Sequence, residues 1–246
     1  MDLPDLTKLS LGEGGTRAKW LKACGVRPRF RNWRNLRGSQ KRTLLHDVAR
    51  LADDDTTADG DYVSAYEQVD IDDMFAGNSQ WSVEHVVPRS HIDGRRAHAA
   101  ENDPIGWIEA TASANSRRSN YPLYLWPDVE SEGVPGAGVS IALPNTLVRV
   151  DGEIHYVPPM EQRARLARKW LFIRATYPGI DPPSAAQKAR GSQIVALAKH
   201  YPVQPAELRV NKHYRDTMGW ANPLLEKGGE RWLEDASWRA LILFSF

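Results

Sequence analysis

A glutamate followed directly by a histidine, Glu84 and His85, is the pair of residues in this sequence that most clearly suggests chemistry. A carboxylate is a hard oxygen ligand of the kind Mg²⁺ prefers, and a neutral imidazole beside it can deprotonate water without binding metal. The pair lies in a β-branched run that ends at Pro88, which predicts a short strand. Adjacent strand residues point to opposite faces, so one site can use both only where a bulge or a second element surrounds them.

A second segment carries Asn115 and Arg118, three residues apart in a stretch predicted to be helical from Thr111 to Arg118. Residues at this spacing share one face of a helix, so an amide oxygen and a guanidinium would project together. The amide oxygen suits a metal's oxygen shell, and the guanidinium suits a phosphate group. A capped surface helix is the simpler interpretation of this segment taken alone.

Together the two segments resemble the endonuclease I family of bacterial periplasmic and secreted nucleases. That family has a Glu-His-Val-Val-Pro-like strand, an Asp-Leu-His-Asn-Leu-like turn and a Val-Asn-x-x-Arg-Gly/Ser-Asn helix. In this chain the turn position holds Asp103-Pro104-Ile105-Gly106-Trp107, and the distance from Asp103 to Asn115 resembles the family's without a gap. The likeness runs in one order over roughly residues 36–226, and that collinearity is worth more than any single motif.

The resemblance implies a metal-dependent endonuclease that hydrolyses phosphodiester bonds of DNA, with RNA left open as a substrate. It implies that Glu84 and Asn115 hold one Mg²⁺, for which Mn²⁺ could substitute, that His85 is the general base, and that Arg118 contacts phosphate. Relatives have another arginine between the motifs, which Arg95 or Arg96 could supply; the sequence does not choose between them. The further residues expected to contact nucleic acid are Arg117, Asn120, Arg31 and Arg34.

The elements that must position these residues are mostly helices. The predicted fold class is α+β, with a ββα-metal finger motif embedded in a mainly helical domain that also has a β-hairpin. The hairpin is predicted around Asp151-Gly152. Helices are predicted from the periodicity of apolar residues and from their Pro and Gly boundaries. They are Arg17–Cys24, a stretch that begins at Ser39 and includes Leu51, one that follows Pro158-Pro159 and continues to Tyr177, Ser184–His200 and Pro205–Thr217.

The likeness divides the chain into a basic appendage over residues 1–35, a nuclease-like domain over 36–226 and a tail over 227–246. Arg31 and Arg34 lie in the appendage among aromatic residues, so this segment could follow a phosphate backbone and stack on bases. It could equally pair with the acidic stretch over residues 53–73.

Composition sets wide bounds on function. The 246 residues carry a net charge of +1, but this sum hides opposite blocks that cancel, so it does not exclude a polyanionic partner. Cys24 is the only cysteine, which rules out an intramolecular disulfide and predicts a core residue. With no signal peptide and no apolar run long enough for a membrane span, we expect a cytoplasmic protein. A nuclease there needs restriction, which suggests an inhibitor and a phage, mobile-element or defence role.

Two other functions remain open from the sequence. A site-directed HNH-type nicking or homing endonuclease would use the same metal chemistry on a defined sequence, with the Arg- and Trp-rich segment before residue 43 adding recognition. A catalytically silent nucleic-acid-binding module is the alternative from another class, and the joint presence of Glu84, His85 and Asn115 argues against it.

Overall fold

The computed structural model describes residues 15–25, 38–52, 64–67, 71–76, 81–92, 99–127, 144–177 and 180–244. Its elements belong to a mixed α+β class. The helices are α1 (Thr16–Cys24), α2 (Gly38–Ala52), α3 (Ile71–Ala76), α5 (Ala112–Arg118), α6 (Met160–Thr176), α7 (Ala185–Ala189), α8 (Gly191–His200), α9 (Pro205–Met218), α10 (Glu230–Glu234) and α11 (Ala236–Phe244). Short 3₁₀ turns are η3 (Arg89–His91), η4 (Pro104–Gly106) and η6 (Pro223–Leu225).

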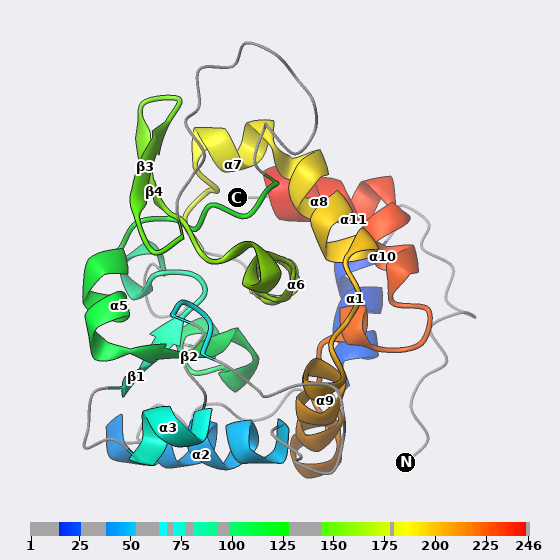
Figure 1. The fold of residues 1–246 in the computed structure, drawn as a ribbon. Helices are drawn as coiled ribbons and strands as arrows, with labels where there is room; N and C mark the ends of the chain where they lie inside the picture. The colour runs from blue at the N-terminus through cyan, green and yellow to red at the C-terminus, as the bar shows by residue number, and fades with distance from the viewer. Residues whose placement is uncertain are drawn as a thin grey trace.

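Helix α6 runs through the middle of the molecule, as Figure 1 shows. Every residue from Arg163 to Thr176 except Lys169 is buried, which is typical of a helix enclosed on all sides. Its neighbours include α1, α8, α11, η4 and η6. The helix starts after Pro159 and ends at Thr176, with Tyr177 as its C-cap, because the proline that follows Tyr177 in the sequence disfavours helical backbone there. The predicted helix here is confirmed.

Buried arginines on α6 are satisfied inside the protein. Arg168 pairs with Glu207 on α9, donating 3.0 Å and 2.5 Å hydrogen bonds to the two carboxylate oxygens. Arg165 pairs with Glu109 on β2. A buried charge is tolerated only when a partner compensates it, so these pairs fix how α6 sits against α9 and β2.

Strands β1 (Trp81–His85) and β2 (Trp107–Thr111) form an antiparallel pair in which Glu84 lies opposite Ile108 and His85 opposite Trp107. Helix α5 begins directly after β2, where the Thr111 side chain accepts a hydrogen bond from Ala114 N–H and caps the first turn. Two strands and a helix are therefore packed together at the left of Figure 1, with α2 below them.

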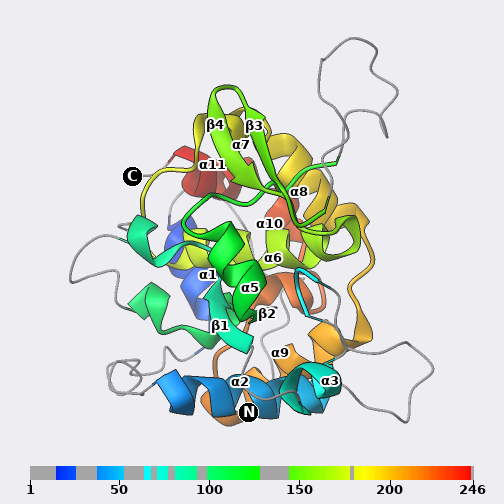
Figure 2. The same cartoon turned by 60° about the vertical axis from the view of Figure 1, so that its left-hand side comes forward.

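A second antiparallel pair, β3 (Leu147–Val150) and β4 (Glu153–Tyr156), turns at Asp151 and Gly152. Both residues have positive φ, 51° and 86°, which is the backbone of a type I′ turn and explains the preference for Asp-Gly there. The predicted hairpin is confirmed. Figures 1 and 2 both show it extending away from the β1–β2 pair.

The predicted helix over Ser184–His200 is in fact two helices, α7 and α8, which meet at Arg190. A capping box between Ser184 and Gln187 starts α7, and the non-helical backbone of Arg190, with φ −104° and ψ 16°, ends it. Glycine at the next position, Gly191, is a poor helix former and allows the chain to restart in a new direction.

Parts of residues 1–35 and of residues 227–246, the two segments at the ends of the chain, belong to the core. Trp20 on α1 is fully buried, donates a 2.9 Å hydrogen bond to Thr176 Oγ1 on α6, and contacts Trp232 on α10 and Trp238 on α11 with ring centroids 5.1 Å apart in each case. Cys24 is buried with it, which confirms its prediction as a core residue.

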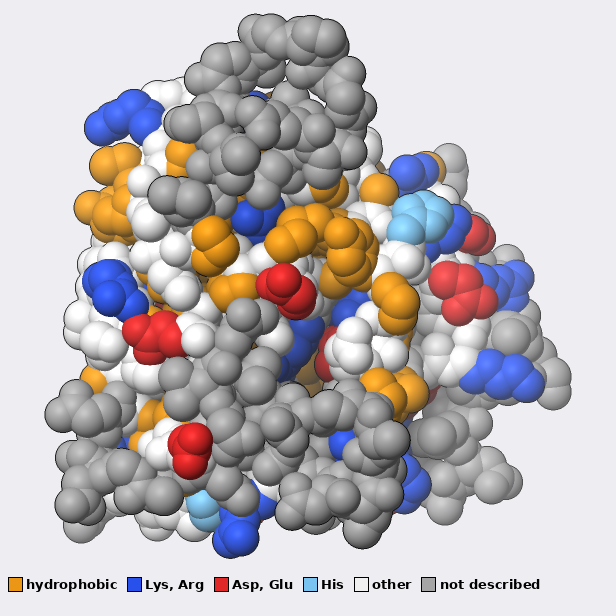
Figure 3. Space-filling view, in the orientation of Figure 1, with side chains coloured by type: hydrophobic (Ala, Val, Ile, Leu, Met, Phe, Trp, Pro, Cys, Tyr) orange, Lys and Arg blue, Asp and Glu red, His pale blue; other side chains and the backbone are white. Residues whose placement is uncertain are grey.

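Basic side chains on the face seen in Figure 3 are scattered among acidic and apolar ones rather than gathered in one patch, as far as its described residues go. None of the helices in the described ranges is both long and apolar enough to cross a lipid bilayer.

Candidate active site

A cavity of about 420 Å³ lies where the end of β1 meets α5. Among the residues that line it are the two predicted metal ligands, the predicted base and two residues predicted to contact nucleic acid, namely Glu84, Asn115, His85, Arg118 and Asn120. The two segments that carry the predicted site residues, about thirty positions apart in the sequence, therefore meet in one place.

Helix α5 crosses one face of β1, and the two periodicities match. Ser82 and Glu84 share a strand face because they are two residues apart, and Asn115 and Arg118 share a helix face because they are three apart. Asn115 Nδ2 donates a 2.7 Å hydrogen bond to Ser82 Oγ, and Arg118 pairs with Glu84. Because the Asn115 amide nitrogen is held by Ser82, its amide oxygen is the atom left for a ligand.

Arg118 is almost fully enclosed, with 1% of its surface exposed. Its guanidinium donates to the carbonyls of His85 at 2.8 Å, Val86 at 3.1 Å and Tyr121 at 2.9 Å, besides its contact with Glu84 Oε1. The sequence predicted that this side chain contacts phosphate. Its contacts tie the end of β1 to the end of α5 and balance the buried Glu84 charge, as a positioning residue does, and contact with phosphate stays a prediction.

His85 lies on the opposite side of β1 from Glu84, at the last residue of the strand, where both can line the cavity. Its Nε2 is 2.9 Å from the carbonyl oxygen of Glu101. A carbonyl can only accept a hydrogen bond, so Nε2 carries the hydrogen and Nδ1 carries the lone pair in the neutral ring. Burial lowers the pKa of His85 to about 4, which keeps the ring neutral at pH 7.

The loop that leads into β2 is anchored by Asp103, which is fully buried. Its carboxylate accepts hydrogen bonds from Ile105 N–H at 2.9 Å, from the Tyr177 hydroxyl at 2.6 Å and from Trp220 Nε1 at 3.1 Å. Burial raises the pKa of Asp103 to about 6, and these donors oppose that rise. Asp103 thus connects the β1–β2 unit to the end of α6 and to the segment after α9.

The remaining predicted nucleic-acid contacts lie in different situations. Arg117 forms an ion pair with Glu67 at 2.5 Å, with about half of its side chain exposed. Asn120 is exposed at the edge of the cavity. Arg95, Arg96, Arg31 and Arg34 lie outside the described residues.

Two groups that hold side chains of this cavity in place were not predicted from the sequence: Ser82, which accepts from Asn115, and the Glu101 carbonyl, which accepts from His85. Ser82 could have been found, because it stands two residues before Glu84 on the same strand face. The Glu101 carbonyl could not, because every residue has a carbonyl, and only the folded chain brings this one to His85.

Among the described residues, no three or more His, Cys, Asp or Glu side chains are grouped so that they could hold a metal ion. One carboxylate, one amide and water, the ligand set expected from the sequence, is a smaller protein contribution than such a group. In comparisons with known proteins, no family model and no curated protein matches this chain.

Proposed function

We propose that this protein is a metal-dependent endonuclease that hydrolyses phosphodiester bonds of DNA at the cavity between β1 and α5. The observation that carries the proposal is the convergence of Glu84, His85 and Asn115 on this cavity, with the His85 ring held in the tautomer that leaves Nδ1 as a base. The β1–β2–α5 order and the resemblance to endonuclease I support a ββα-metal site. DNA is the expected substrate, and RNA remains open.

The donor set fits one Mg²⁺. Glu84 contributes a carboxylate and Asn115 an amide oxygen, both hard ligands, and the Ser82 hydrogen bond orients the amide. When bound, the ion would polarise the phosphate and stabilise the charge that develops on the leaving oxygen. Glu84 also pairs with Arg118, which holds the carboxylate at the cavity and offsets part of its charge.

The residues of the chain itself supply the proton chemistry. His85 Nδ1 accepts the proton of the attacking water, and its neutral state at pH 7 follows from burial. As the ring becomes positive, Nε2–H donates more strongly to the Glu101 carbonyl, which stabilises the imidazolium and keeps its orientation. Asn120, exposed at the cavity edge, can donate to a neighbouring phosphate.

The test is cleavage of supercoiled plasmid in Mg²⁺ and in EDTA. A smear in Mg²⁺ alone indicates a non-selective endonuclease, discrete bands indicate a site-directed nicking or homing enzyme, and intact plasmid that still binds the protein indicates a silent binding module. His85→Ala should lose about 10²- to 10⁴-fold in rate while DNA binding is kept.

A matched pair of variants tests the metal ligand. Asn115→Ala should raise the Mg²⁺ concentration needed for half-maximal cleavage, whereas Asn115→Asp keeps an oxygen ligand and should retain more activity. Lys212→Met, on the exposed face of α9 where Lys212 pairs with Asp216, is the control. Cleavage by His85→Ala at the wild-type rate would refute the mechanism.

A further inference from the structure

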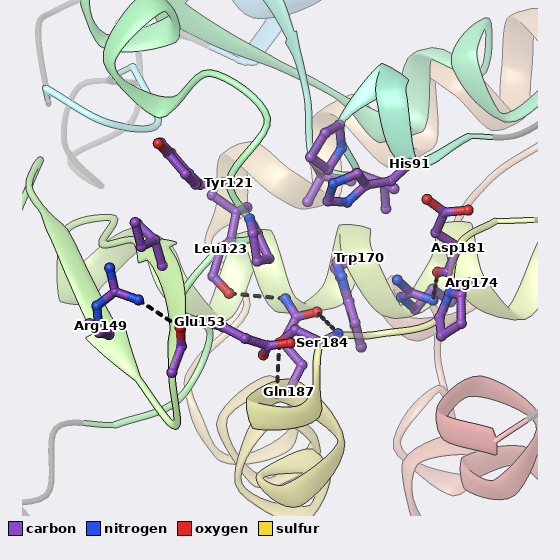
Figure 4. A pocket seen from close by; sticks show the side chains of 17 residues that line it. His91, Tyr121, Leu123, Arg149, Glu153, Trp170, Arg174, Asp181, Ser184 and Gln187 are labelled. Carbon is purple, nitrogen blue, oxygen red and sulfur yellow. Dashed lines mark hydrogen bonds between the residues drawn. The ribbon is translucent and has the colours of Figure 1, made fainter.

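A second cavity of about 580 Å³ lies beyond the candidate active site, between η3, the β3–β4 hairpin, α6 and the start of α7. This volume is within the range of sites that hold a small organic ligand. Figure 4 shows Arg174 and Asp181 at one end, Arg149 and Glu153 of the hairpin at the other, and Trp170 of α6 between them.

The walls of this cavity are held by contacts between distant segments. The Asp181 N–H donates to the His91 carbonyl at 2.8 Å, and an isolated bridge pairs Ile92 with Ile180 beside it. On the other wall, Gln187 Nε2 donates to the Leu123 carbonyl at 3.0 Å. These long-range bonds indicate a preformed cavity rather than a gap between loosely packed loops.

At one end of the cavity lies the Arg174 guanidinium, which has one hydrogen-bond donor without an acceptor among the described residues. Its side chain is about nine-tenths buried, its guanidinium stacks over the Trp170 ring at 4.6 Å, and Nη1 donates to the Asp181 carbonyl at 3.0 Å. Its Nε has no hydrogen-bond partner among the described residues. Burial lowers the pKa of Arg174 to about 9. A buried donor without an acceptor costs about 1–3 kcal/mol, and an anionic ligand would supply the acceptor.

The other polar groups at that end are His91 and the carboxylate of Asp181. Burial lowers the pKa of His91, so the ring is neutral at pH 7 and can donate one hydrogen bond. The Asp181 side chain is exposed, and its charge acts on both His91 and Arg174. At the opposite end, the Glu153 carboxylate already accepts from the backbone of Ala185 and Ala186. The middle of the cavity is apolar and aromatic.

This cavity adjoins the candidate active site, because Pro88 lines both of them. From His85 to Pro88 is three residues, which is at most about 10 Å of extended chain. A strand of nucleic acid advances about 3.4 Å per nucleotide along its axis, so a substrate cut beside His85 would have a nucleotide within a few steps of the cavity.

We propose that the cavity beside Pro88 binds one unpaired nucleotide of the substrate, with its phosphate at Arg174 and its base against Trp170 and Leu123. The proposal rests on the proposed nuclease function only where it calls the nucleotide a part of the substrate. The nucleotide-binding pocket itself does not depend on whether the protein cuts DNA. Unpaired bases in such pockets are held by aromatic contact and by hydrogen bonds at their edges. The neighbouring cavity would then favour single-stranded or locally opened DNA.

The test is calorimetric titration of the full chain in EDTA with deoxyadenosine 5′-monophosphate, inorganic phosphate and deoxyadenosine. The mononucleotide should bind at one site, and each of the two fragments should bind at least about tenfold more weakly, because each lacks one of the two sets of contacts. Arg174→Met should lose about tenfold or more in affinity, the usual worth of a hydrogen bond to a charged group. Lys212→Met removes a positive charge elsewhere and should bind normally.

Two further variants keep the test decisive if Arg174→Met does not fold. Asp181→Asn removes an exposed carboxylate next to the phosphate position and should tighten mononucleotide binding about twofold or more. Ile154→Phe places a larger side chain of the partly exposed hairpin in the lining of the cavity and should weaken mononucleotide binding. Tighter binding of inorganic phosphate than of the mononucleotide, or weaker binding by Asp181→Asn, would overturn the proposal.

A final arm separates a free nucleotide from one within a strand. A ten-nucleotide single strand of deoxyadenosine should compete with the mononucleotide more strongly than a duplex of the same length, and equal competition would overturn the unpaired-strand assignment. Mononucleotide binding by a protein that does not cut plasmid would refute the proposed function and leave the pocket. Plasmid cleavage without mononucleotide binding would refute the pocket and leave the function.

Discussion

Replacing Arg118 by methionine should be far more costly than replacing its neighbour Arg117, although both are arginines in the last turn of α5. Methionine keeps a long apolar side chain but removes every donor. Three carbonyls, of His85, Val86 and Tyr121, then lose a partner, and Glu84 is left as a buried carboxylate without its cation.

The magnitude follows from these contacts. Breaking a buried ion pair by removing one partner costs about 3–5 kcal/mol, because the remaining charge is uncompensated. Arg117 makes a half-exposed ion pair with Glu67, and such pairs contribute about 0–1 kcal/mol. We therefore expect Arg118→Met to lower the free energy of unfolding by about 3–5 kcal/mol, and Arg117→Met by less than about 1 kcal/mol.

Urea denaturation followed by tryptophan fluorescence and circular dichroism measures both values. A double-mutant cycle with Glu84→Gln isolates the charge, because Arg118→Met should cost about 1–3 kcal/mol less when position 84 is already neutral. If Arg118→Met cannot be purified folded, Arg118→Lys, which keeps the charge but serves fewer carbonyls, replaces it in the cycle. Equal losses for Arg117→Met and Arg118→Met, or a coupling energy near zero, would refute the positioning role of Arg118.

Three other predictions concern the frame around the site. Burial raises the pKa of Asp103 to about 6, so the fold is up to about 3 kcal/mol more stable with Asp103 protonated than with it ionised. This added stability is present below about pH 4 and is lost as the pH rises through 6. Urea titrations across this range should show the loss in wild type but not in Asp103→Asn. Gly106→Ala would place a Cβ 2.7 Å from Ile173 Cδ1 and should cost about 1–3 kcal/mol, less in an Ile173→Val background that lacks that atom; equal thermal shifts in both backgrounds would contradict the clash. Deleting residues 1–35 removes the buried Trp20 and should lower the free energy of unfolding by at least about 3–5 kcal/mol; a deletion that melts like wild type would contradict the packing of Trp20. DNA contact is better tested by Arg31→Ala combined with Arg34→Ala, which should reduce the slope of log affinity against log salt concentration by about 2.

Much of the local structure could be predicted from the sequence. Asp151-Gly152 specified the hairpin because a type I′ turn needs two residues that tolerate positive φ. The prolines on either side of α6 set its limits, and Thr111 set the start of α5. The local sequence of each segment also predicted that Glu84 lies on a strand and Asn115 on a helix. These features depend on residues within a turn or two of one another.

Features that depend on distant contacts could not be read from the sequence. It drew α1, within residues 1–35, as part of an appendage, whereas Trp20 packs against Trp232 and Trp238 from the other end of the chain. A short helix with little amphipathic character gives no local sign of whether it will be buried, because that depends on which apolar surfaces meet it. The continuous helix predicted over Ser184–His200 failed for a similar reason, since periodicity does not register a change of direction at Arg190.

The candidate site depends partly on the sequence alone and partly on the tertiary structure. The residue types at 84, 85, 115 and 118 are a property of the sequence, and they limit the chemistry to oxygen ligands, one base and one cation. Only the tertiary structure determined which of these groups face one cavity, which imidazole nitrogen of His85 keeps its lone pair, and that Arg118 contacts Glu84. The physical reason is that these outcomes depend on backbone carbonyls and on burial, and the type of a residue determines neither. Every residue has the same carbonyl, and burial depends on how the whole chain packs.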